Sequence, residues 1–306
     1  MSDASIVITT KDRFEDLQLA VESALAQVGR FEILVIDDGS TDCTPAIQAR
    51  YPQIRYIRSE KNLGLVEQRN RAGHLASSPV IVSLDDDAVF QDPHTVAMAL
   101  DELDSPSTAV LAMPYIDADV GILQQNRPSE GNWATGLFVG TAYAIKRQAF
   151  LDVGGYRGFF FRQGEERDLC LRLLDVGLLI KLGSTPPILH KRSPLNRDHA
   201  HIAYYGRRND LLYTALTLPT KAWPRASLSL AHRFWQDTLA GYPKASAAGL
   251  ASGVRQGFTL SHLRRPVSRG TYLLHRRLSR GPIPFEEALE ALTAEKGQRL
   301  QSSDVT

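Results

Sequence analysis

The sequence predicts an α/β fold in which helices cover a mostly parallel central sheet. Short apolar, β-branched runs alternate with segments of helical periodicity in the first half of the chain, which is the pattern of βαβ units. Polar clusters follow three of these runs directly, as expected where strands end at a ligand-binding edge. From about residue 216, prolines punctuate basic and apolar segments that contain no clear strand, so we add a helical C-terminal region.

The individual elements follow from the same periodicities. Strand-like runs lie at residues 5–9, 31–37, 54–58, 80–84, 109–115, 135–145 and 178–183. Helical spacing connects Leu17, Val21, Ala24 and Leu25, and further helices are expected at 64–76 and 164–177, the last of them ended by Gly177. The polar tail, 296–306, is expected to fray.

Composition narrows the class of protein. The chain has 306 residues with 43% hydrophobic and 23% charged residues, which is typical of globular domains. Its two cysteines, Cys43 and Cys170, exclude a disulfide framework and suit a reducing compartment. The N-terminus lacks the pattern of a secretory signal, and no stretch approaches the roughly 18 apolar residues of a membrane span. We therefore expect a cytoplasmic protein.

Three adjacent carboxylates, Asp85, Asp86 and Asp87, follow the run at 80–84. Hard divalent cations such as Mg²⁺ and Mn²⁺ bind through one or two carboxylates together with substrate phosphates. In an extended segment Asp85 and Asp87 point to the same side and Asp86 to the other, so the outer pair can hold one cation. The alternative is a solvated acidic turn.

Two further polar clusters allow either a purely structural or a ligand-binding interpretation. "VIDDGSTDCT" (35–44) ends a strand and reads as a helix-capping turn, which leaves Asp38 free to accept a hydrogen bond from a base or ribose. "NLGLVEQRNRA" (62–72) places Arg69 more than one turn into a helix, where it either reaches a phosphate or remains on the surface.

These segments, in this order, resemble the donor-binding half of the inverting glycosyltransferase family 2. The quoted stretches are "SIVITTKDRF", "FEILVIDDGSTDCT", "NLGLVEQRNRA" and "VIVSLDDDAVF". The resemblance covers about residues 4–215 and implies the GT-A fold, a Rossmann-like α/β/α sandwich with a mixed central sheet. It also implies a nucleoside-diphosphate sugar donor and Mn²⁺ or Mg²⁺ as cofactor. We expect a catalytic domain at 1–215, with a donor half at 1–115 and an acceptor half at 116–215, and a basic helical extension at 216–306.

The resemblance also assigns roles to residues. It implies donor contacts at Thr9, Asp38, Arg69, Asp85 and Asp86, where Asp86 fills the variable middle position of an Asp-x-Asp motif. It implies that Asp87, the leading metal ligand, binds the cation together with Asp85 and His190. On the acceptor side it points to Trp133, which could equally be a buried aromatic residue, and to Asp168. Arg208, in "YYGRRNDLLY", either contacts the diphosphate or pairs with the sheet.

"GEERDLCLR" (164–172) resembles the family segment that supplies the general base. Its second acidic residue is Glu166, where the common form has Asp, and Glu165 precedes it. Inverting transfer needs one carboxylate to take the proton of the acceptor hydroxyl, and a second carboxylate alongside raises its pKa. An acidic first turn that only stabilises a helix N-terminus is the alternative.

The expected function is thus a metal-dependent inverting glycosyltransferase of glycan or polysaccharide biosynthesis, which acts on a glycan or lipid-linked acceptor. A catalytically impaired nucleotide-sugar-binding relative is one alternative. A sugar-phosphate nucleotidyltransferase is another, and "TTKDRF" argues against it because the glycine-rich loop of that class is missing.

The charge is unevenly divided along the chain. Residues 221–281 contain eleven Lys or Arg residues and one acidic residue, Asp237, although the whole chain carries only +1. Such a segment either rests on an anionic membrane, which would place the protein at the inner face, or packs on the catalytic domain with a solvated basic face. We expect no nucleic acid partner.

Overall fold

The computed structural model describes residues 2–191 and 198–303, and within them a nine-stranded sheet forms the centre of the molecule. Its strand order is β13-β9-β11-β6-β10-β4-β1-β2-β3. The strands are β1 Ala4–Thr10, β2 Phe31–Asp37, β3 Arg55–Arg58, β4 Val80–Asp85, β6 Thr108–Ala112, β9 Trp133–Thr135, β10 Ala142–Lys146, β11 Leu179–Leu182 and β13 Ile283–Pro284.

The sheet is mixed, as the resemblance predicts. β1 pairs in parallel with β2 and β4, whereas β10 runs antiparallel to both β4 and β6. In this register Thr9 lies opposite Asp85, and Thr10 lies opposite Asp37. The carboxyl ends of three strands therefore meet at one edge, which brings their polar clusters together.

A smaller sheet stands beside this edge, with the strand order β5-β12-β7-β8. Its strands are β5 Ala88–Phe90, β12 Ile188–His190, β7 Tyr115–Asp117 and β8 Leu123–Gln124. β5 follows β4 after a two-residue turn, and β12 pairs with it so that His190 lies opposite Ala88. This pairing carries His190 to the aspartates although about a hundred residues of chain separate them.

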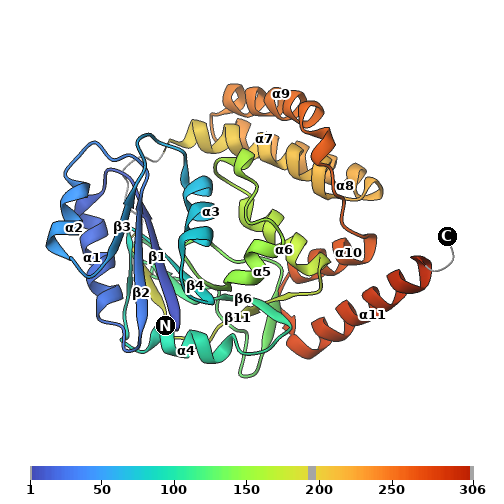
Figure 1. The fold of residues 1–306 in the computed structure, drawn as a ribbon. Helices are drawn as coiled ribbons and strands as arrows, with labels where there is room; N and C mark the ends of the chain where they lie inside the picture. The colour runs from blue at the N-terminus through green and yellow to red at the C-terminus, as the bar shows by residue number, and fades with distance from the viewer. Residues whose placement is uncertain (1, 192–197, 304–306) are drawn as a thin grey trace.

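Helices cover both faces of the large sheet, and each face has its own apolar core (Figure 1). Alternation along β1 divides the two: Ile6 and Ile8 face one core, and Val7 faces the other. The helices in this part of the chain are α1 Phe14–Leu25, α2 Ile47–Arg50, α3 Leu65–Leu75, α4 Thr95–Glu102, α5 Arg147–Asp152 and α6 Glu165–Asp175. This arrangement is the predicted α/β/α sandwich.

Two expected strands are interrupted. The run at 109–115 divides into β6 and β7 around Pro114, which has no amide proton to donate to a ladder. The run at 135–145 divides into β9 and β10, with residues 136–141 between them. Gly140 belongs to that break, and a Cβ atom there would lie 2.4 Å from Nη1 of Arg69. The interruption therefore makes room for a buried arginine next to β4.

The C-terminal region, residues 216–306, is helical as predicted. Its helices are preceded by α7 His199–Thr217 and comprise α8 Trp223–Leu239, α9 Pro243–Thr259, α10 Arg269–Leu278 and α11 Phe285–Ser303. α9 lies along α7 at close range (Figure 1). Gly249 and Gly253 permit this approach, because a Cβ atom at either position would collide with the α7 backbone.

The last helices share the core of the first domain. Leu274 and Leu278 of α10 and Leu292 of α11 join the same apolar cluster as β6 and β11, and β13 extends the large sheet next to β9. The division at residue 215 stays a prediction. α11 continues to Ser303, so most of the tail expected to fray is helical, and 304–306 lie outside the described residues. No helix in the described part of the chain has the length and apolar character needed to cross a membrane.

Candidate active site

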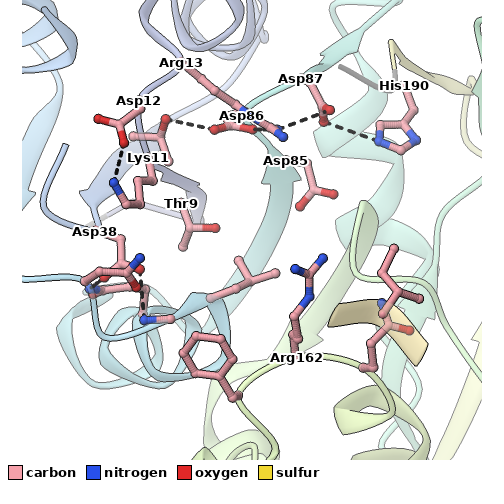
Figure 2. A pocket seen from close by; sticks show the side chains of 18 residues that line it. Thr9, Lys11, Asp12, Arg13, Asp38, Asp85, Asp86, Asp87, Arg162 and His190 are labelled. Atoms are coloured by element: carbon pink, nitrogen blue, oxygen red, sulfur yellow. Dashed lines mark hydrogen bonds and ion pairs between the residues drawn. The ribbon is translucent and has the colours of Figure 1, made fainter. Parts of the chain in front are cut away.

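A pocket of about 670 Å³ opens at the carboxyl ends of β1, β2 and β4 (Figure 2). Six of the residues predicted from the sequence line it: Thr9, Asp38, Asp85, Asp86, Asp87 and His190. The remaining five do not line it: Arg69, Trp133, Glu165, Glu166 and Asp168. The pocket is therefore the place where most of the predicted donor and metal residues converge.

The three aspartates point in different directions from the end of β4. Asp85 accepts hydrogen bonds from Arg69 Nη2 and Thr141 Oγ1, both at 2.9 Å. Asp86 turns the other way and accepts from Thr10 Oγ1 at 2.8 Å and Arg13 Nη1 at 2.9 Å. Burial raises the pKa of Asp86 to about 7. The predicted separation of Asp86 from the outer pair is thus what the structure has, although Asp86 and Asp87 lie in a turn and not in an extended strand.

Arg13 supplies a positive charge that sequence reasoning missed. Its Nη1 lies 2.9 Å from Asp86 and 3.4 Å from Asp87, so the guanidinium bridges the two carboxylates (Figure 2). The only signal in the sequence was its place in the polar loop after the first strand. Because Arg13 and Arg69 flank the aspartates from opposite sides, protein cations already offset part of the acidic charge.

The outer pair and His190 form a group that fits a divalent cation. One ligand atom from each of Asp85, Asp87 and His190 lies within 4.8 Å of the others. Asp117 holds Nδ1 of His190 at 2.8 Å, which directs Nε2 toward Asp87 at 3.3 Å. A carboxylate behind a histidine in this way is the usual support of a metal-binding imidazole. Two carboxylates and one imidazole are ligands that a divalent cation can use.

Arg69 connects the aspartates to the two glutamates. It is 6% exposed, and its Nη1 lies 3.6 Å from Glu166 and 4.0 Å from Glu165 while Nη2 holds Asp85. Arg69 thus lies immediately behind Asp85 and compensates three carboxylates at once. The resemblance implied a position beside a donor phosphate, whereas in the structure the Arg69 side chain is buried and does not line the pocket.

The two glutamates at the start of α6 differ in exposure. The Glu165 side chain is 4% exposed, and its Oε2 has no hydrogen-bond partner among the described residues. The Glu166 side chain is 20% exposed. Burial and the neighbouring Glu166 raise the pKa of Glu165, and burial raises that of Glu166 against the opposing effect of Arg69. Glu166 is therefore the more accessible of two carboxylates with a raised affinity for protons.

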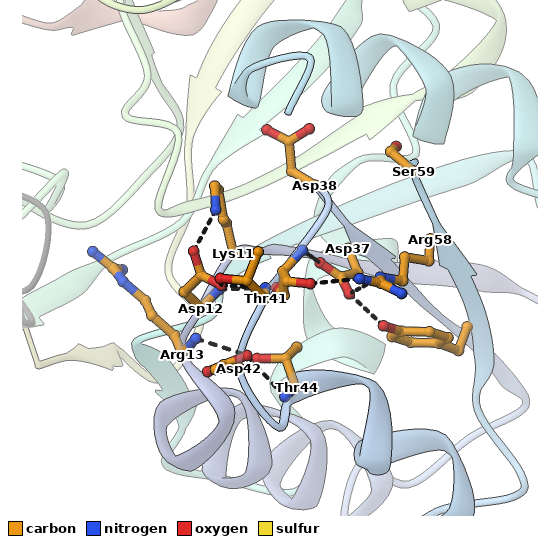
Figure 3. A network of polar contacts seen from close by, with 12 residues as sticks. Lys11, Asp12, Arg13, Asp37, Asp38, Thr41, Asp42, Thr44, Arg58 and Ser59 are labelled. Carbon is orange, nitrogen blue, oxygen red and sulfur yellow. Dashed lines mark hydrogen bonds and ion pairs between the residues drawn. The ribbon is translucent and has the colours of Figure 1, made fainter. Parts of the chain in front are cut away.

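Asp38 lines the pocket, but its carboxylate is used within the protein. It accepts hydrogen bonds from the amides of Leu63 and Gly64 at 2.7 and 2.9 Å and from Gln68 Nε2 at 2.5 Å. Two of these contacts bind backbone amides just before α3, that of its N-cap Gly64 among them. Figure 3 shows Asp37 directed away from Asp38 into a separate network with Arg58 and the turn after β2.

Trp133 and Asp168 lie away from the pocket. Trp133 starts β9, four strands from β4 in the sheet order, and its indole nitrogen donates to the Ser129 carbonyl at 3.1 Å. Asp168 is fully buried, and it pairs with Arg172 at 2.7 Å and accepts from Thr217 at 2.6 Å. Asp168 thus belongs to an interior polar network, whereas the half-buried Trp133 packs against the edge of the apolar core.

The loop before α6 contributes pocket residues that the sequence reading did not single out. Phe161, Arg162 and Gln163 line the pocket, and Arg162 extends into it from the side opposite His190 (Figure 2). Phe161 and Gln163 have positive φ angles of 64° and 73°, which cost free energy in residues with a side chain.

Asn209 and Arg208 of α7 hold this loop in its conformation. The Asn209 amide donates to the carbonyls of Phe160, Arg162 and Gln163 at 3.0, 2.6 and 2.7 Å. Arg208 Nη2 donates to the Phe160 carbonyl at 2.7 Å. The Arg208-Asn209 pair thus acts on the backbone of this loop and not on the sheet, and a contact of Arg208 with the diphosphate stays a prediction.

Comparison with known proteins agrees with this geometry. The sequence is 28% identical over 209 residues to the succinoglycan biosynthesis protein ExoU of Rhizobium meliloti, covering 59% of each chain. It is 26% identical over 250 residues to an N-acetylglucosaminyl-diphospho-decaprenol L-rhamnosyltransferase of Mycobacterium tuberculosis, covering 67% of this chain and 80% of the relative. The match to ExoU therefore spans about three fifths of that relative.

The fold has a counterpart among solved structures. The mannosyltransferase PcManGT of Pyrobaculum calidifontis, in complex with GDP-Man and Mn²⁺, superimposes with a TM-score of 0.56 at 16% identity, over 96% of this chain and 88% of that one. This likeness confirms the predicted GT-A fold. The sequence model of glycosyl transferase family 2 matches residues 5–164, which is more than half of the chain. The chain belongs to glycosyl transferase family 2.

Proposed function

We propose that this protein is a metal-dependent inverting glycosyltransferase that moves a sugar from a nucleoside-diphosphate sugar to an acceptor hydroxyl. The observation that carries the proposal is the convergence of Asp85, Asp87 and His190 on a pocket at the carboxyl ends of the strands. Family membership supports sugar transfer, and the acidic group supports a cation between protein and diphosphate.

The three ligand residues would hold Mn²⁺ or Mg²⁺, which when bound supplies positive charge to a leaving diphosphate. Arg162 adds a second positive charge from the opposite wall, and no ion pair is formed by its side chain among the described residues. Thr9 and Asp38 would face the nucleoside, with Asp38 also holding the backbone at 63–64 in place. Arg69 would act on the donor indirectly by orienting Asp85.

Glu166 is the proposed general base. The acceptor oxygen forms a bond with the anomeric carbon, the bond from that carbon to the diphosphate breaks, and the hydroxyl proton passes to the Glu166 carboxylate. This carboxylate is the more exposed of the pair, and burial raises its pKa, which makes it a stronger base than a solvated glutamate. Glu165 is buried beside it with a pKa raised to about 8, so at neutral pH Glu165 would hold a proton and leave the negative charge on Glu166.

For the acceptor we infer only a chemical class, and for the location only a compartment. We infer a glycan or lipid-linked acceptor, because one relative is named for succinoglycan biosynthesis and another for a decaprenol-linked sugar. The cytoplasmic location, at the inner face of a membrane, stays a prediction that rests on two unpaired cysteines and the basic segment at 221–281.

A thermal-shift screen of nucleoside-diphosphate sugars with and without Mn²⁺ tests the proposal. The donor should raise the unfolding temperature only when metal is present, because a ligand that binds the native state stabilises it. Release of the nucleoside diphosphate on addition of acceptor would then establish transfer. Metal-dependent donor binding without any turnover would instead identify a catalytically impaired relative, and no stabilisation by any donor would contradict the proposal.

A further inference from the structure

Helix α8 carries an apolar stripe on the side that faces away from the protein. Leu228, Trp235 and Leu239 are 74%, 60% and 71% exposed, and no residue of α8 is fully buried. At 100° per residue these three positions lie within about 40° of one another around the helix. A helix on a protein surface normally turns its polar face to water, so this outer stripe requires an explanation.

The orientation of α8 is set by polar contacts on its other side. Arg233 donates to Asp210 of α7 at 2.8 Å, and Asp237 accepts from Ser246 of α9 at 2.7 Å. The half-buried Leu230 and Phe234 lie on this inner side as well. These contacts fix the helix on α7 and α9, and within residues 2–191 and 198–303 nothing covers the outer stripe.

Exposed positive charge accompanies the stripe on α8 and α9. Arg225 lies about 60° from Leu228 around the helix, and Lys221, Lys244 and Arg255 are exposed nearby in sequence or on the packed helix α9. The single acidic residue of the segment 221–281, Asp237, is already paired with Arg207. The charged side chains that this segment exposes are therefore cations, and its one carboxylate is paired.

We infer that the outer stripe of α8, with Phe258 of the adjacent helix α9, binds the surface of an anionic membrane. Phe258 is 78% exposed, and it lies about 180° around α9 from Gly249, which packs against α7, so it too faces away from the protein. Leucine, tryptophan and phenylalanine enter the interface between headgroups and acyl chains, and arginine and lysine pair with anionic headgroups.

Charge favours a lipid surface over a second copy of the chain, because two such basic surfaces would repel each other. Neither α8 nor α9 contributes a described residue to the pocket, so the inference goes beyond the proposed function and does not rest on it.

Sedimentation with vesicles tests the inference on the full chain. The protein should pellet with phosphatidylcholine vesicles that contain phosphatidylglycerol, pellet weakly with phosphatidylcholine alone, and be released by high salt. The variant Leu228→Ser/Trp235→Ser/Leu239→Ser should lose at least about tenfold in its partition coefficient. A matched control, Val28→Ser/Val176→Ser, removes apolar side chains of 54% and 51% exposure from the sheet domain and should bind like the wild type.

Two further measurements decide among the outcomes. Circular dichroism and thermal unfolding establish that the triple variant is folded, and Arg225→Gln/Lys244→Gln/Arg255→Gln serves as a second variant that leaves the apolar stripe intact. Weaker binding of this charge variant to anionic vesicles supports the inference. Equal vesicle binding by wild type and triple variant overturns it. A wild-type dimer in sedimentation velocity that the triple variant dissociates also overturns it, because the occupant is then a second copy.

Discussion

Arg69 lies between Asp85 and Glu166, with one guanidinium nitrogen 2.9 Å from the aspartate and the other 3.6 Å from the glutamate. Asp85 belongs to the proposed metal group, and Glu166 is the proposed base. A single buried cation thus neutralises a carboxylate on each side of the reaction. The Arg69 side chain therefore fixes the positions of Asp85 and Glu166 relative to each other.

Replacement of Arg69 by methionine should destabilise the protein by about 3 to 5 kcal/mol, because it leaves buried carboxylates without their counter-charge. The free energy of unfolding in urea measures the loss. The double variant Arg69→Met/Asp85→Asn removes one of the stranded charges and should recover part of the stability. If the single and double variants are equally stable, Arg69 does not compensate Asp85.

Replacement of Asp87 by asparagine should raise the Kd of a nucleoside diphosphate in the presence of Mn²⁺ by at least about tenfold, since a metal-binding carboxylate is lost. Isothermal titration calorimetry measures the effect. Asp86→Asn is the control, because Asp86 is the neighbouring carboxylate outside the group of Asp85, Asp87 and His190, although Arg13 contacts both Asp86 and Asp87. Similar losses in both variants would assign the effect to general acidity and not to metal ligation.

Glu166→Gln should lower kcat by about 10² to 10⁴-fold while the donor Kd stays within error of the wild-type value. The amide keeps the size of the side chain but cannot take the acceptor proton. Single-turnover assays with the donor found in the screen measure the step. Glu165→Gln is the control, and a larger fall in that variant would move the base to the buried carboxylate.

Asn209→Ala should loosen the loop before α6. The carbonyls of Arg162 and Gln163 lose their side-chain donor, which costs about 1 to 3 kcal/mol, whereas the Phe160 carbonyl keeps its bond from Arg208. The positive φ angles of Phe161 and Gln163 then lose much of their support. Hydrogen exchange of residues 159–164 should increase and KM should rise more than kcat falls. Unchanged exchange in this loop would show that its conformation does not depend on α7.

Much of the fold, and the residues of the candidate metal group, could be predicted from short sequence segments. The strand-ending clusters were visible because parallel strands place their carboxyl ends at one edge, so Asp38 and Asp85 had to lie near each other. The motif order also pointed to His190, which the structure places beside Asp87, and to Glu166, whose role stays a prediction. Each of these features is encoded within one short, continuous segment of the chain, so it can be recognised without knowledge of the tertiary structure.

Other placements depend on the spatial order of the strands. Trp133 follows the polar loop at 124–132 and was expected at the acceptor cleft, yet β9 lies four strands from β4. Arg13 pairs with aspartates more than seventy residues away, and nothing local to "TTKDRF" indicates that contact. Asp168 shares a helix with Glu166 but lies on its buried face, where Arg157 and Arg172 surround it.

The stability of the protein should fall between neutral pH and pH 5 in a way that depends on His275 of α10. His275 is 5% exposed, and burial together with the nearby Arg167 lowers its pKa to about 4. In the unfolded chain its pKa is about 6.5, so below that pH the unfolded state binds a proton that the folded state excludes. The contribution is absent above about pH 7 and should reach about 2 kcal/mol of destabilisation at pH 5. Urea unfolding of wild type and His275→Gln at both pH values measures it: the variant should show the smaller loss on acidification, and equal losses in the two proteins would contradict the assignment.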